Sequence, residues 1–492
     1  MSIIADNLLL VYILYPLATF VFLGLCEDDA DDMVNVMFVS TFAMLLFTLS
    51  LYSEFDHAQS GYQYAETYKW SVDSKFCLSL GVDGISMVML LLITGIMPIC
   101  VFAVACTMEN ETEKLFEYLH YLLMIEFLLV VTFTTTNLLV FYVSFEGVLI
   151  PMFLMMGSFG ARENKINAAY YFFLYTLFGS FFLLFGIFYL YSIGQSLDYE
   201  VLSKIVLSRN EQIGLFLCFF IPFAIKIPMM PFHIWLPKAH VEAPTIGSVI
   251  LASLLLKLGG YGFLRFTLPW FPLGVEYFSS FVCCLATISI IYASFTAMRQ
   301  SDLKKIIAYT SIAHMNFIVL GMFSLTHQGI DGAIYLMVAH GVVSAALFFC
   351  VGMLYDRYDT RELKNFSGLV QVMPVFVVFF CIFTLSNMGF PGTSNFVGEL
   401  LIFVGLAEQN IFILVLASTS IVLSAIYSIW LYNRVSYGTL KVGSFSDINR
   451  SEFFILFILA AAVLLLGLNA SLITDLTSTA VQDIITQYAS KK

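Results

Sequence analysis

Residues 222–265 read PFAIKIPMMPFHIWLPKAHVEAPTIGSVILASLLLKLGGYGFLR, and this stretch decides the fold of the chain. It holds two lysines, Lys226 and Lys257, among apolar residues. Four prolines punctuate the segment between the lysines: Pro228, Pro231, Pro237 and Pro244. A lysine deep in a bilayer is costly unless it is paired or hydrated, and a proline-broken membrane helix frees backbone groups that lipid cannot satisfy. The stretch therefore predicts a polar pathway inside protein at mid-membrane depth.

The composition of the 492-residue chain is that of a membrane protein. Its mean hydropathy is +0.91, 60% of its residues are hydrophobic and 11% are charged. Soluble domains usually carry about 25% charged residues, and a β-barrel would show short alternating segments instead of long apolar runs. The composition predicts an all-α polytopic membrane protein.

Apolar runs of about 20 residues predict fourteen transmembrane helices. They fall near 8–25, 34–52, 84–105, 116–134, 137–157, 167–194, 212–236, 245–266, 278–297, 303–324, 331–355, 372–408, 411–432 and 452–473. The seventh and twelfth are long and interrupted. The longest connecting loop, 53–83, is rich in tyrosine and carries no recognisable motif.

A second interrupted span lies at Leu385–Leu400, which reads LSNMGFPGTSNFVGEL. Gly389, Pro391 and Gly392 break the apolar run, and Glu399 follows the break. Two Gly/Pro-interrupted spans in corresponding positions are typical of transporters with inverted repeats and a site at the breaks. We therefore predict two inverted five-helix repeats, formed by spans four to eight and nine to thirteen, with helices 7 and 12 broken.

The predicted organisation has four parts along the chain. Three transmembrane helices and a loop occupy 1–113, the first five-helix repeat occupies 114–270, the second occupies 271–435, and a C-terminal transmembrane helix with a tail occupies 436–492.

Six ionisable residues in the predicted spans form the candidate site: Glu146, Lys226, Lys257, His314, His340 and Glu399. Helix rise places the first five about 13 to 21 Å along their spans. Burial favours the neutral form of a lysine or a glutamate, whereas a nearby opposite charge favours the charged form. Moving a glutamate relative to a lysine therefore changes whether the lysine holds its proton, and histidine passes protons near neutral pH. The residue types predict a proton relay.

Each of these residues also has a purely structural interpretation. Glu146 and Lys226 could be a static buried ion pair, although such pairs contribute little net stability. His314 and His340 could be hydrogen-bonded core histidines. The relay interpretation is favoured because several costly charges share the interrupted region.

Three further residues stay open between function and packing. Glu126 is a buried acid without a broken helix around it. His233 and His240 flank the Trp–Leu–Pro turn at the end of the first interrupted span, and they fit the protein surface as well as a relay.

Several activities lack any sequence support. The chain shows no P-loop, no G-x-G-x-x-G, no haem C-x-x-C-H and no iron–sulfur cysteine cluster. None of its nine cysteines forms a C-x-x-C pair, so we expect no metal site. A net charge of −12 without a basic arm argues against nucleic-acid binding. We expect neither nucleotide hydrolysis nor electron transfer in this chain.

Three motifs resemble a known family. KIPMMPFHIWLPKAHVEAPTIGSVILASLLLKLGGYG at 226–262 resembles the signature of the antiporter-like subunits of respiratory complex I. FEGVLIPMF at 145–153 and NMGFPGTSNFVGE at 387–399 resemble the family's fifth-span and twelfth-span motifs. The resemblance covers about 115–435. Within the family the broken twelfth span carries a glutamate in one type of subunit and a lysine in others, and this chain has Glu399.

The resemblance implies a role for each candidate residue. These roles are a controlling ion pair of Glu146 and Lys226, a central relay residue in Lys257, bridging residues in His314 and His340, and an exit-side proton carrier in Glu399. It also implies a subunit of a proton-pumping NADH:ubiquinone reductase that performs no redox chemistry itself. NADH, FMN, iron–sulfur clusters and ubiquinone would be bound by partner subunits.

The expected partners are other membrane-arm subunits, including neighbouring antiporter-like subunits, and lipids. A content of 50 Phe in 492 residues, with many Ile and Tyr, is typical of AT-rich codon usage. It favours the mitochondrial inner membrane, with a bacterial plasma membrane as the alternative.

Other functions remain open from the sequence. The nearest alternative is the large membrane subunit of a multi-subunit cation/proton antiporter or of a membrane-bound hydrogenase. A stand-alone solute transporter is disfavoured because no further polar pocket residues cluster at the breaks. A structural scaffold is disfavoured because it would not need several buried charges.

Overall fold

The computed structural model describes residues 7–24, 30–69, 77–107, 112–160, 162–441 and 446–491. In these residues eleven helices are long and apolar enough to cross a membrane, and two shorter apolar helices, Leu8–Leu23 and Pro374–Asn387, accompany them. The predicted all-α polytopic fold class is confirmed. The total of fourteen transmembrane helices stays a prediction.

The N-terminal part contains three long helices and one β-hairpin. Its elements are α2 (Leu8–Leu23), α3 (Ala30–Glu54), β1 (Gln63–Lys69), β2 (Cys77–Val82) and α4 (Gly84–Thr107). The two strands pair antiparallel. The hairpin lies in the loop 53–83, whose residues 70–76 are outside the described part. Sequence analysis missed these strands because the tyrosine-rich segment shows no clear alternation of apolar and polar residues.

The next part begins with α5 and ends with the short helix α14. Its elements are α5 (Thr112–Thr134), α6 (Leu138–Gly147), α7 (Leu149–Phe159), α8 (Lys165–Gly194), α9 (Tyr199–Leu202), α10 (Arg209–Lys226), α11 (Trp235–Glu242), α12 (Thr245–Ile250), the π-helical turns η1 (Leu251–Leu255) and η2 (Phe263–Thr267), α13 (Leu256–Gly262) and α14 (Leu268–Trp270). One span is divided at Val148 because Pro151 has no N–H to donate to the carbonyl of Gly147.

The remaining elements follow the same helical pattern. They are α15 (Pro272–Arg299), α16 (Leu303–Phe323), α17 (His327–Tyr358), the 3₁₀ turns η3 (Leu363–Asn365) and η4 (Leu369–Gln371), α18 (Pro374–Asn387), α19 (Ser394–Gln409), α20 (Ile411–Ser436), α21 (Arg450–Leu468) and α22 (Ser471–Lys491). The C-terminal tail expected from the sequence is therefore largely a helix. This helix was not predicted because its many polar residues make the segment too hydrophilic to resemble a transmembrane helix.

Both predicted helix breaks are present. The first separates α10 from α11, and the second separates α18 from α19. In the first, Pro228 and Pro231 remove backbone donors that would continue the helix. In the second, Gly389 and Gly392 take positive φ values of 73° and 90°, a conformation that glycine adopts without steric cost.

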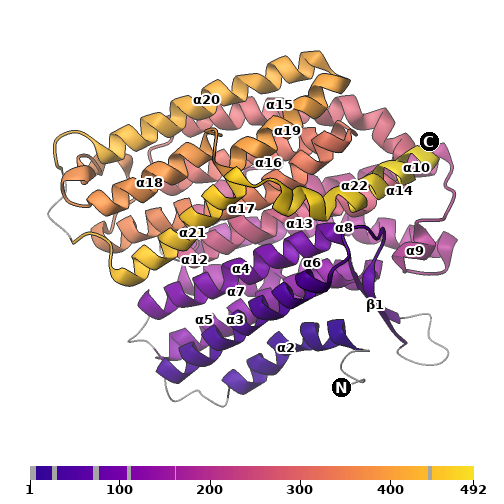
Figure 1. The fold of residues 1–492 in the computed structure, drawn as a ribbon, viewed down its shortest axis with the longest axis horizontal. Coiled ribbons are helices and arrows are strands. Elements are labelled where there is room, and N and C mark those ends of the chain that lie inside the picture. Colours follow the sequence, from indigo (N-terminus) through magenta and orange to yellow (C-terminus); the bar gives the residue numbers. More distant parts are fainter. Residues whose placement is uncertain are drawn as a thin grey trace.

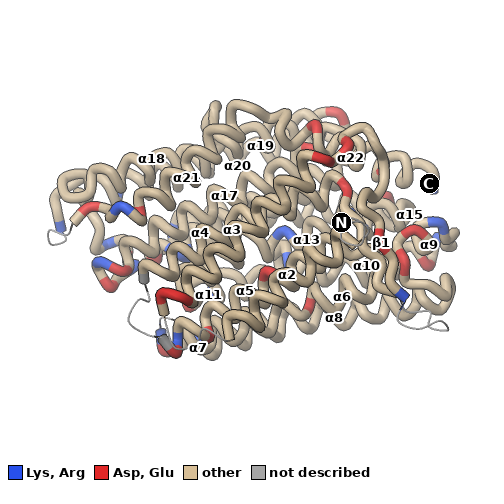
Figure 2. The backbone as a smooth tube through the Cα atoms, turned by 60° about the horizontal axis from the view of Figure 1, so that its bottom comes forward, with Lys and Arg blue, Asp and Glu red and all other residues tan. Residues whose placement is uncertain are grey.

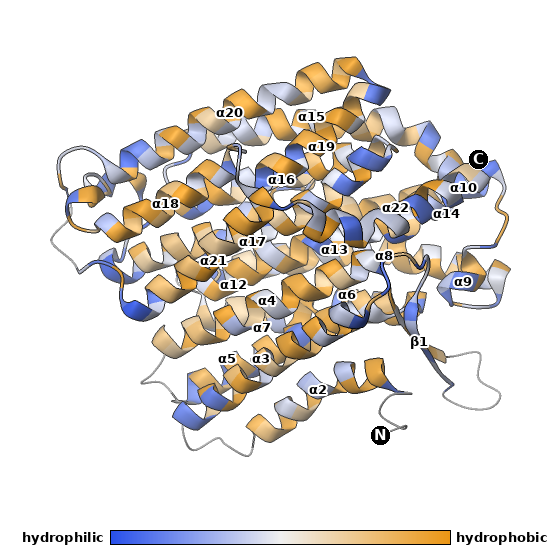
Figure 3. Cartoon of the chain, viewed as in Figure 1, coloured by the Kyte–Doolittle hydropathy of each residue, from blue (hydrophilic) through white to orange (hydrophobic). Residues whose placement is uncertain are grey.

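The long helices lie side by side, from α2 at one edge to α20 at the other (Figure 1). Both described termini, the hairpin and α9 lie at the same end of the bundle. Charged residues gather mainly at the two ends of the helices, and a few remain between them, including blue segments beside α13 and a red segment beside α5 (Figure 2). The apolar middle of the bundle is visible as an orange zone in Figure 3.

The core of the bundle is formed by the spans Thr245–Trp270 and His327–Tyr358. Each is wholly buried over an 18-residue window, whereas only 22% of such a window is buried in α20. Helices that are apolar all round belong in a core or face lipid. The interrupted helix Thr245–Trp270, which carries Lys257, therefore lies in protein and not against lipid.

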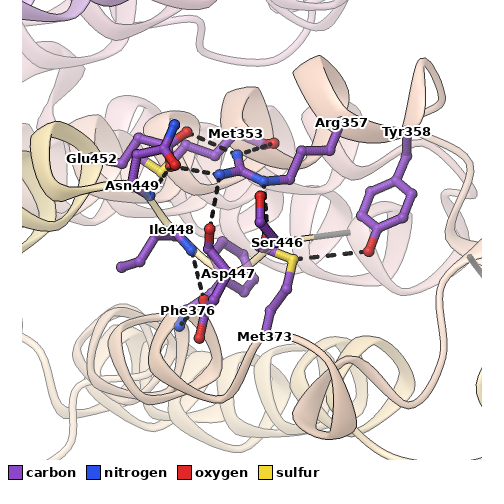
Figure 4. A network of polar contacts seen from close by, with 10 residues as sticks. All are labelled: Met353, Arg357, Tyr358, Met373, Phe376, Ser446, Asp447, Ile448, Asn449 and Glu452. Carbon is purple, nitrogen blue, oxygen red and sulfur yellow. Dashed lines mark hydrogen bonds and ion pairs between the residues drawn. The ribbon is translucent and has the colours of Figure 1, made fainter. Parts of the chain in front are cut away.

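A polar network fastens three helices at one end of the bundle (Figure 4). Arg357, near the end of α17, binds both carboxylate oxygens of Glu452 on α21, at 2.8 and 2.6 Å. Asp447 accepts hydrogen bonds from the first backbone amides of α18, Val375 and Phe376. A bidentate Arg–carboxylate pair fixes geometry as well as charge. The network therefore sets the positions of α17, α18 and α21.

Candidate functional site

The centre of the site is a contact between a lysine and a histidine. Lys257 on α13 lies 2.9 Å, Nζ to Nδ1, from His340 on α17, and the two side chains are almost fully buried. Lys257 also donates a 2.6 Å hydrogen bond to the carbonyl of Ala252, in the π-helical turn η1. A charged ammonium group can only donate. The imidazole nitrogen of His340 is therefore the acceptor when Lys257 is charged.

A second contact joins a histidine to a glutamate. His314 on α16 places Nε2 3.4 Å from Oε1 of Glu399 on α19. Its other ring nitrogen, Nδ1, lies 3.0 Å from the carbonyl oxygen of Thr310. A carbonyl oxygen only accepts, so Nδ1 carries a hydrogen and Nε2 faces the carboxyl group. The His314–Glu399 pair therefore places a ring nitrogen opposite a carboxyl oxygen, a geometry in which the two groups can share a proton.

The two contacts are neighbours in the core. The rings of His314 and His340 have centroids 5.6 Å apart, with planes inclined by 47°. This spacing leaves the rings without a hydrogen bond but close enough for one intervening group. Four of the six predicted residues therefore lie in one row, Lys257, His340, His314 and Glu399, in which no hydrogen bond joins the two histidines.

The other two candidates, Glu146 and Lys226, form a looser pair. Glu146 ends its helix α6 beside Gly147, and both of its buried carboxylate oxygens lack a hydrogen-bond partner. Lys226 is 3% exposed, and its Nζ lies 4.5 Å from the centroid of the Phe145 ring. The two charges interact electrostatically, but among the described residues no hydrogen bond or ion pair joins them.

The pair and the row lie on either side of a close contact between α10 and α13. A Cβ atom at Gly259, on α13, would lie 3.1 Å from Cβ of Lys226. The end of α10 therefore packs directly on the helix that carries Lys257. In the described part of the chain no hydrogen bond connects Lys226 with Lys257, so the structure shows a row of four residues and a separate pair.

The three open residues are all buried. Of the two interpretations left open for His233 and His240, surface or relay, the surface position is excluded, because they are 5% and 0% exposed. The ring of His240 stacks on Phe348 at 4.6 Å, and neither of its nitrogens has a hydrogen-bond partner. Glu126 on α5 is 0% exposed, and neither carboxylate oxygen makes a hydrogen bond. None of the three is hydrogen-bonded to the row of four.

Three buried basic residues were missed by the sequence analysis: Lys304, Arg265, and Arg361, which is 1% exposed and donates a 2.6 Å hydrogen bond to the carbonyl of Val241. Lys304, 2% exposed, donates a 2.8 Å hydrogen bond to the carbonyl of Ala243 and lines a cavity of about 950 Å³ at one end of the bundle. Arg265 binds Asp83 and Ser86 from the turn η2. Lys304 and Arg265 both lie near the ends of predicted spans, where the sequence does not show whether a residue is buried or exposed. The apolar flanks of Arg265, in YGFLRFTL, were the available signal.

Metal binding finds no support in the described residues. No group of three or more His, Cys, Asp or Glu side chains in them is placed to hold an ion.

Comparisons with known proteins agree with this description. Residues 135–424 match the family model described as NADH:quinone oxidoreductase/Mrp antiporter, TM. NADH-ubiquinone oxidoreductase chain 4 of Chondrus crispus is 49% identical over 426 residues, which are 86% of each chain. NADH-quinone oxidoreductase subunit M of Rhodobacter capsulatus is 41% identical over 98% of this chain and 97% of that protein.

Solved structures show the same fold. A chain of respiratory complex I from Thermus thermophilus, solved with bound NADH, superposes with a TM-score of 0.89 at 28% identity. The superposition covers 98% of this chain and 99% of that chain.

Proposed function

The chain belongs to the NADH:quinone oxidoreductase/Mrp antiporter family, and we propose that its buried ionisable residues form a proton pathway across the membrane. It is a membrane-arm subunit of proton-pumping NADH:ubiquinone oxidoreductase, respiratory complex I. The sequence-based identification of this family and of its glutamate-bearing type of subunit is confirmed. The chain is an integral membrane protein, and its relatives fit the mitochondrial inner membrane with a bacterial membrane as the alternative.

The observation that carries the proposed pathway is the row of four buried residues. Lys257 and His340 are in hydrogen-bond contact, and His314 and Glu399 face each other at 3.4 Å. A proton released by Lys257 can pass to Nδ1 of His340 along the existing 2.9 Å contact. Its transfer to His314 needs a water molecule or a ring movement across the 5.6 Å centroid separation. From Nε2 of His314 the proton passes to the carboxylate of Glu399.

Glu146 and Lys226 control this transfer electrostatically in our proposal. A carboxylate near an ammonium group favours the charged form, and its withdrawal favours proton release. Because the two groups interact without a direct bond, a small movement of either changes their attraction. Lys226 borders α13, so the change is felt by the neighbouring Lys257.

Energy and redox chemistry come from partner subunits in this proposal. NADH, FMN, iron–sulfur clusters and ubiquinone are bound outside this chain, and quinone reduction there drives the movement of Glu146 and Lys226. The neighbouring antiporter-like subunits and membrane lipids are the expected contacts of its apolar outer helices, such as α20.

The first test is location. Gently solubilised membranes are run on a native gel, stained for NADH oxidation, and this chain is located by mass spectrometry. We expect it in a very large NADH-oxidising band. A smaller assembly without that activity would favour the cation/proton antiporter instead, and sodium-linked proton exchange would then be measured.

The second test concerns the pathway. Lys257→Met in the assembled complex should reduce proton pumping per NADH oxidised about tenfold or more, since a positioned proton carrier contributes at least that factor. The matched control is Lys238→Met, which removes the same charge from an exposed position on α11. Equal pumping in both variants would refute the pathway while leaving membership in the complex intact.

A further inference from the structure

The turn between α18 and α19 contains two glycines in the same backbone conformation. Gly389 and Gly392 have φ values of +73° and +90°. An L-residue pays a similar backbone cost at either position, because both lie in the left-handed region. Backbone conformation alone therefore gives the two glycines equal importance.

Their surroundings differ. A Cβ atom at Gly392 would meet nothing within 4 Å. A Cβ atom at Gly389 would lie 3.1 Å from Cδ of Glu399, and closer still to its Oε2. Contacts of that kind force one group to move. The missing side chain of Gly389 therefore leaves the space that the Glu399 carboxyl group occupies.

The same carboxyl group reaches the relay with its other oxygen. Oε1 of Glu399 faces Nε2 of His314 at 3.4 Å, so the group is held between the turn and the histidine. Beside it lies a small cavity of about 10 Å³, lined by His314, Glu399, Ser424 and Tyr427 among others. A cavity of that size holds about one water molecule. The carboxyl group thus has little room to retreat toward the cavity.

We propose that Gly389 is a positioning residue for proton transfer, because its lack of a side chain lets the Glu399 carboxyl group lie against the helix break and face His314. This inference rests on the proposed relay role of Glu399. A side chain at 389 pushes the carboxyl group away from its place and lengthens the His314–Glu399 contact. A displacement of about 1 Å in a reacting group costs up to about 100-fold in rate.

The test compares Gly389→Ala with Gly392→Ala in the assembled complex. Both introduce the same methyl group at positive φ, but only the first meets Glu399. We expect Gly389→Ala to lower protons pumped per NADH oxidised about tenfold, while Gly392→Ala stays near the unmodified complex at equal assembly on a native gel. Equal losses in the two variants would overturn the proposal.

A double-mutant cycle with Glu399→Asp removes the remaining ambiguity. Aspartate is shorter by one methylene, so its carboxyl group withdraws from the position above residue 389. We expect Gly389→Ala to cause little further loss of pumping in the Glu399→Asp background. An undiminished loss there would show that the glycine serves the backbone only.

Assembly itself serves as a readout if the single variant does not assemble. Restored assembly in Gly389→Ala/Glu399→Asp supports the contact, and failure of both variants overturns it. Glu399→Gln separates this inference from the function it rests on. Normal pumping in Glu399→Gln would refute the relay role of the glutamate, while the packing cycle would still report whether residue 389 touches it.

Discussion

The two broken spans differ in how the backbone groups at the break find hydrogen-bond partners. The first break, between α10 and α11, is closed by side chains of α11, α15 and α16. Trp235 donates to the carbonyl of Ile225 at 2.9 Å, Ser289 accepts from the amide of Met230 at 2.9 Å, and Asn316 donates to the carbonyl of Pro228 at 3.3 Å. Backbone groups that the prolines release are thereby satisfied without water.

The second break, between α18 and α19, makes its bonds locally. The amides of Gly389 and Phe390 bond to carbonyls of α18, at 3.1 Å each. Polar side chains at its edges are buried and have no partner: Ser386 Oγ, Ser394 Oγ and both amide atoms of Asn395. Unpaired buried polar atoms are rare in proteins and mark sites of water or function.

The difference assigns different tasks to the two breaks. The first is a fixed support that ends α10 at Lys226 and packs that end on α13. The second leaves buried polar side chains without partners a few residues before Glu399, the residue that we propose as the exit of the row. The first break is thus tied to neighbouring helices by hydrogen bonds to its backbone, whereas the second has several unpartnered side-chain polar atoms at its edges.

The largest expected effect comes from the residue at the first break. Lys226→Ala should abolish pumping or reduce it at least about tenfold, because the controlling charge is lost, while the complex still assembles. Pumping is measured as proton uptake per NADH oxidised in sealed vesicles, with assembly checked on a native gel. Normal pumping in a fully assembled variant would show that Lys226 at the first break does not control proton transfer.

A smaller effect is expected at the carboxylate that faces this break. Glu146→Gln should reduce pumping more than Glu146→Asp, because glutamine carries no charge and aspartate keeps it. The same vesicle assay measures both variants side by side. Equal and mild losses would indicate a static pair, and the first break would then be structural only.

Stability distinguishes the breaks further. Trp235→Phe leaves the carbonyl of Ile225 without its donor, which should cost about 1–3 kcal/mol. The loss is measured as a lower temperature of half-inactivation of NADH oxidation by the assembled complex. Trp430→Phe, at an exposed position on α20, is the matched control and should leave this temperature nearly unchanged.

The smallest effect is expected at the second break. Ser394→Ala should change stability by less than about 0.5 kcal/mol, because its hydroxyl makes no hydrogen bond to the protein. The same inactivation measurement applies. A loss as large as that of Trp235→Phe would mean that the second break is bonded as tightly as the first, and the contrast between them would disappear.

The sequence predicted the breaks because proline and glycine act locally on the backbone. It also singled out six candidate residues, since an ionisable residue in a long apolar run stands out by itself, and the structure brings four of them together. Their partners could not be predicted, because Lys257 and His340 meet across 83 residues of sequence. Helix packing, which decides such meetings, depends on the shapes of whole faces.

The burial of residues near the ends of the spans also could not be predicted from the sequence. Lys304 and Arg265 lie close to predicted loops and are nevertheless buried by neighbouring helices. The hairpin β1–β2 and the helix α22 were missed because neither shows a strong apolar period. The four-part division of the chain stays a prediction.

The wholly buried helix around Lys257 has a consequence for biosynthesis. A ribosome adds about 5–20 residues per second, so Lys257 is made roughly 4–17 s before His340, 83 residues later. During that interval the lysine lacks the partner that receives it, and a lone lysine at mid-membrane costs about 2.5–3.5 kcal/mol on insertion scales. Lys257 therefore meets His340 only after α17 has been made, so that the order of synthesis limits the order in which the core can pack.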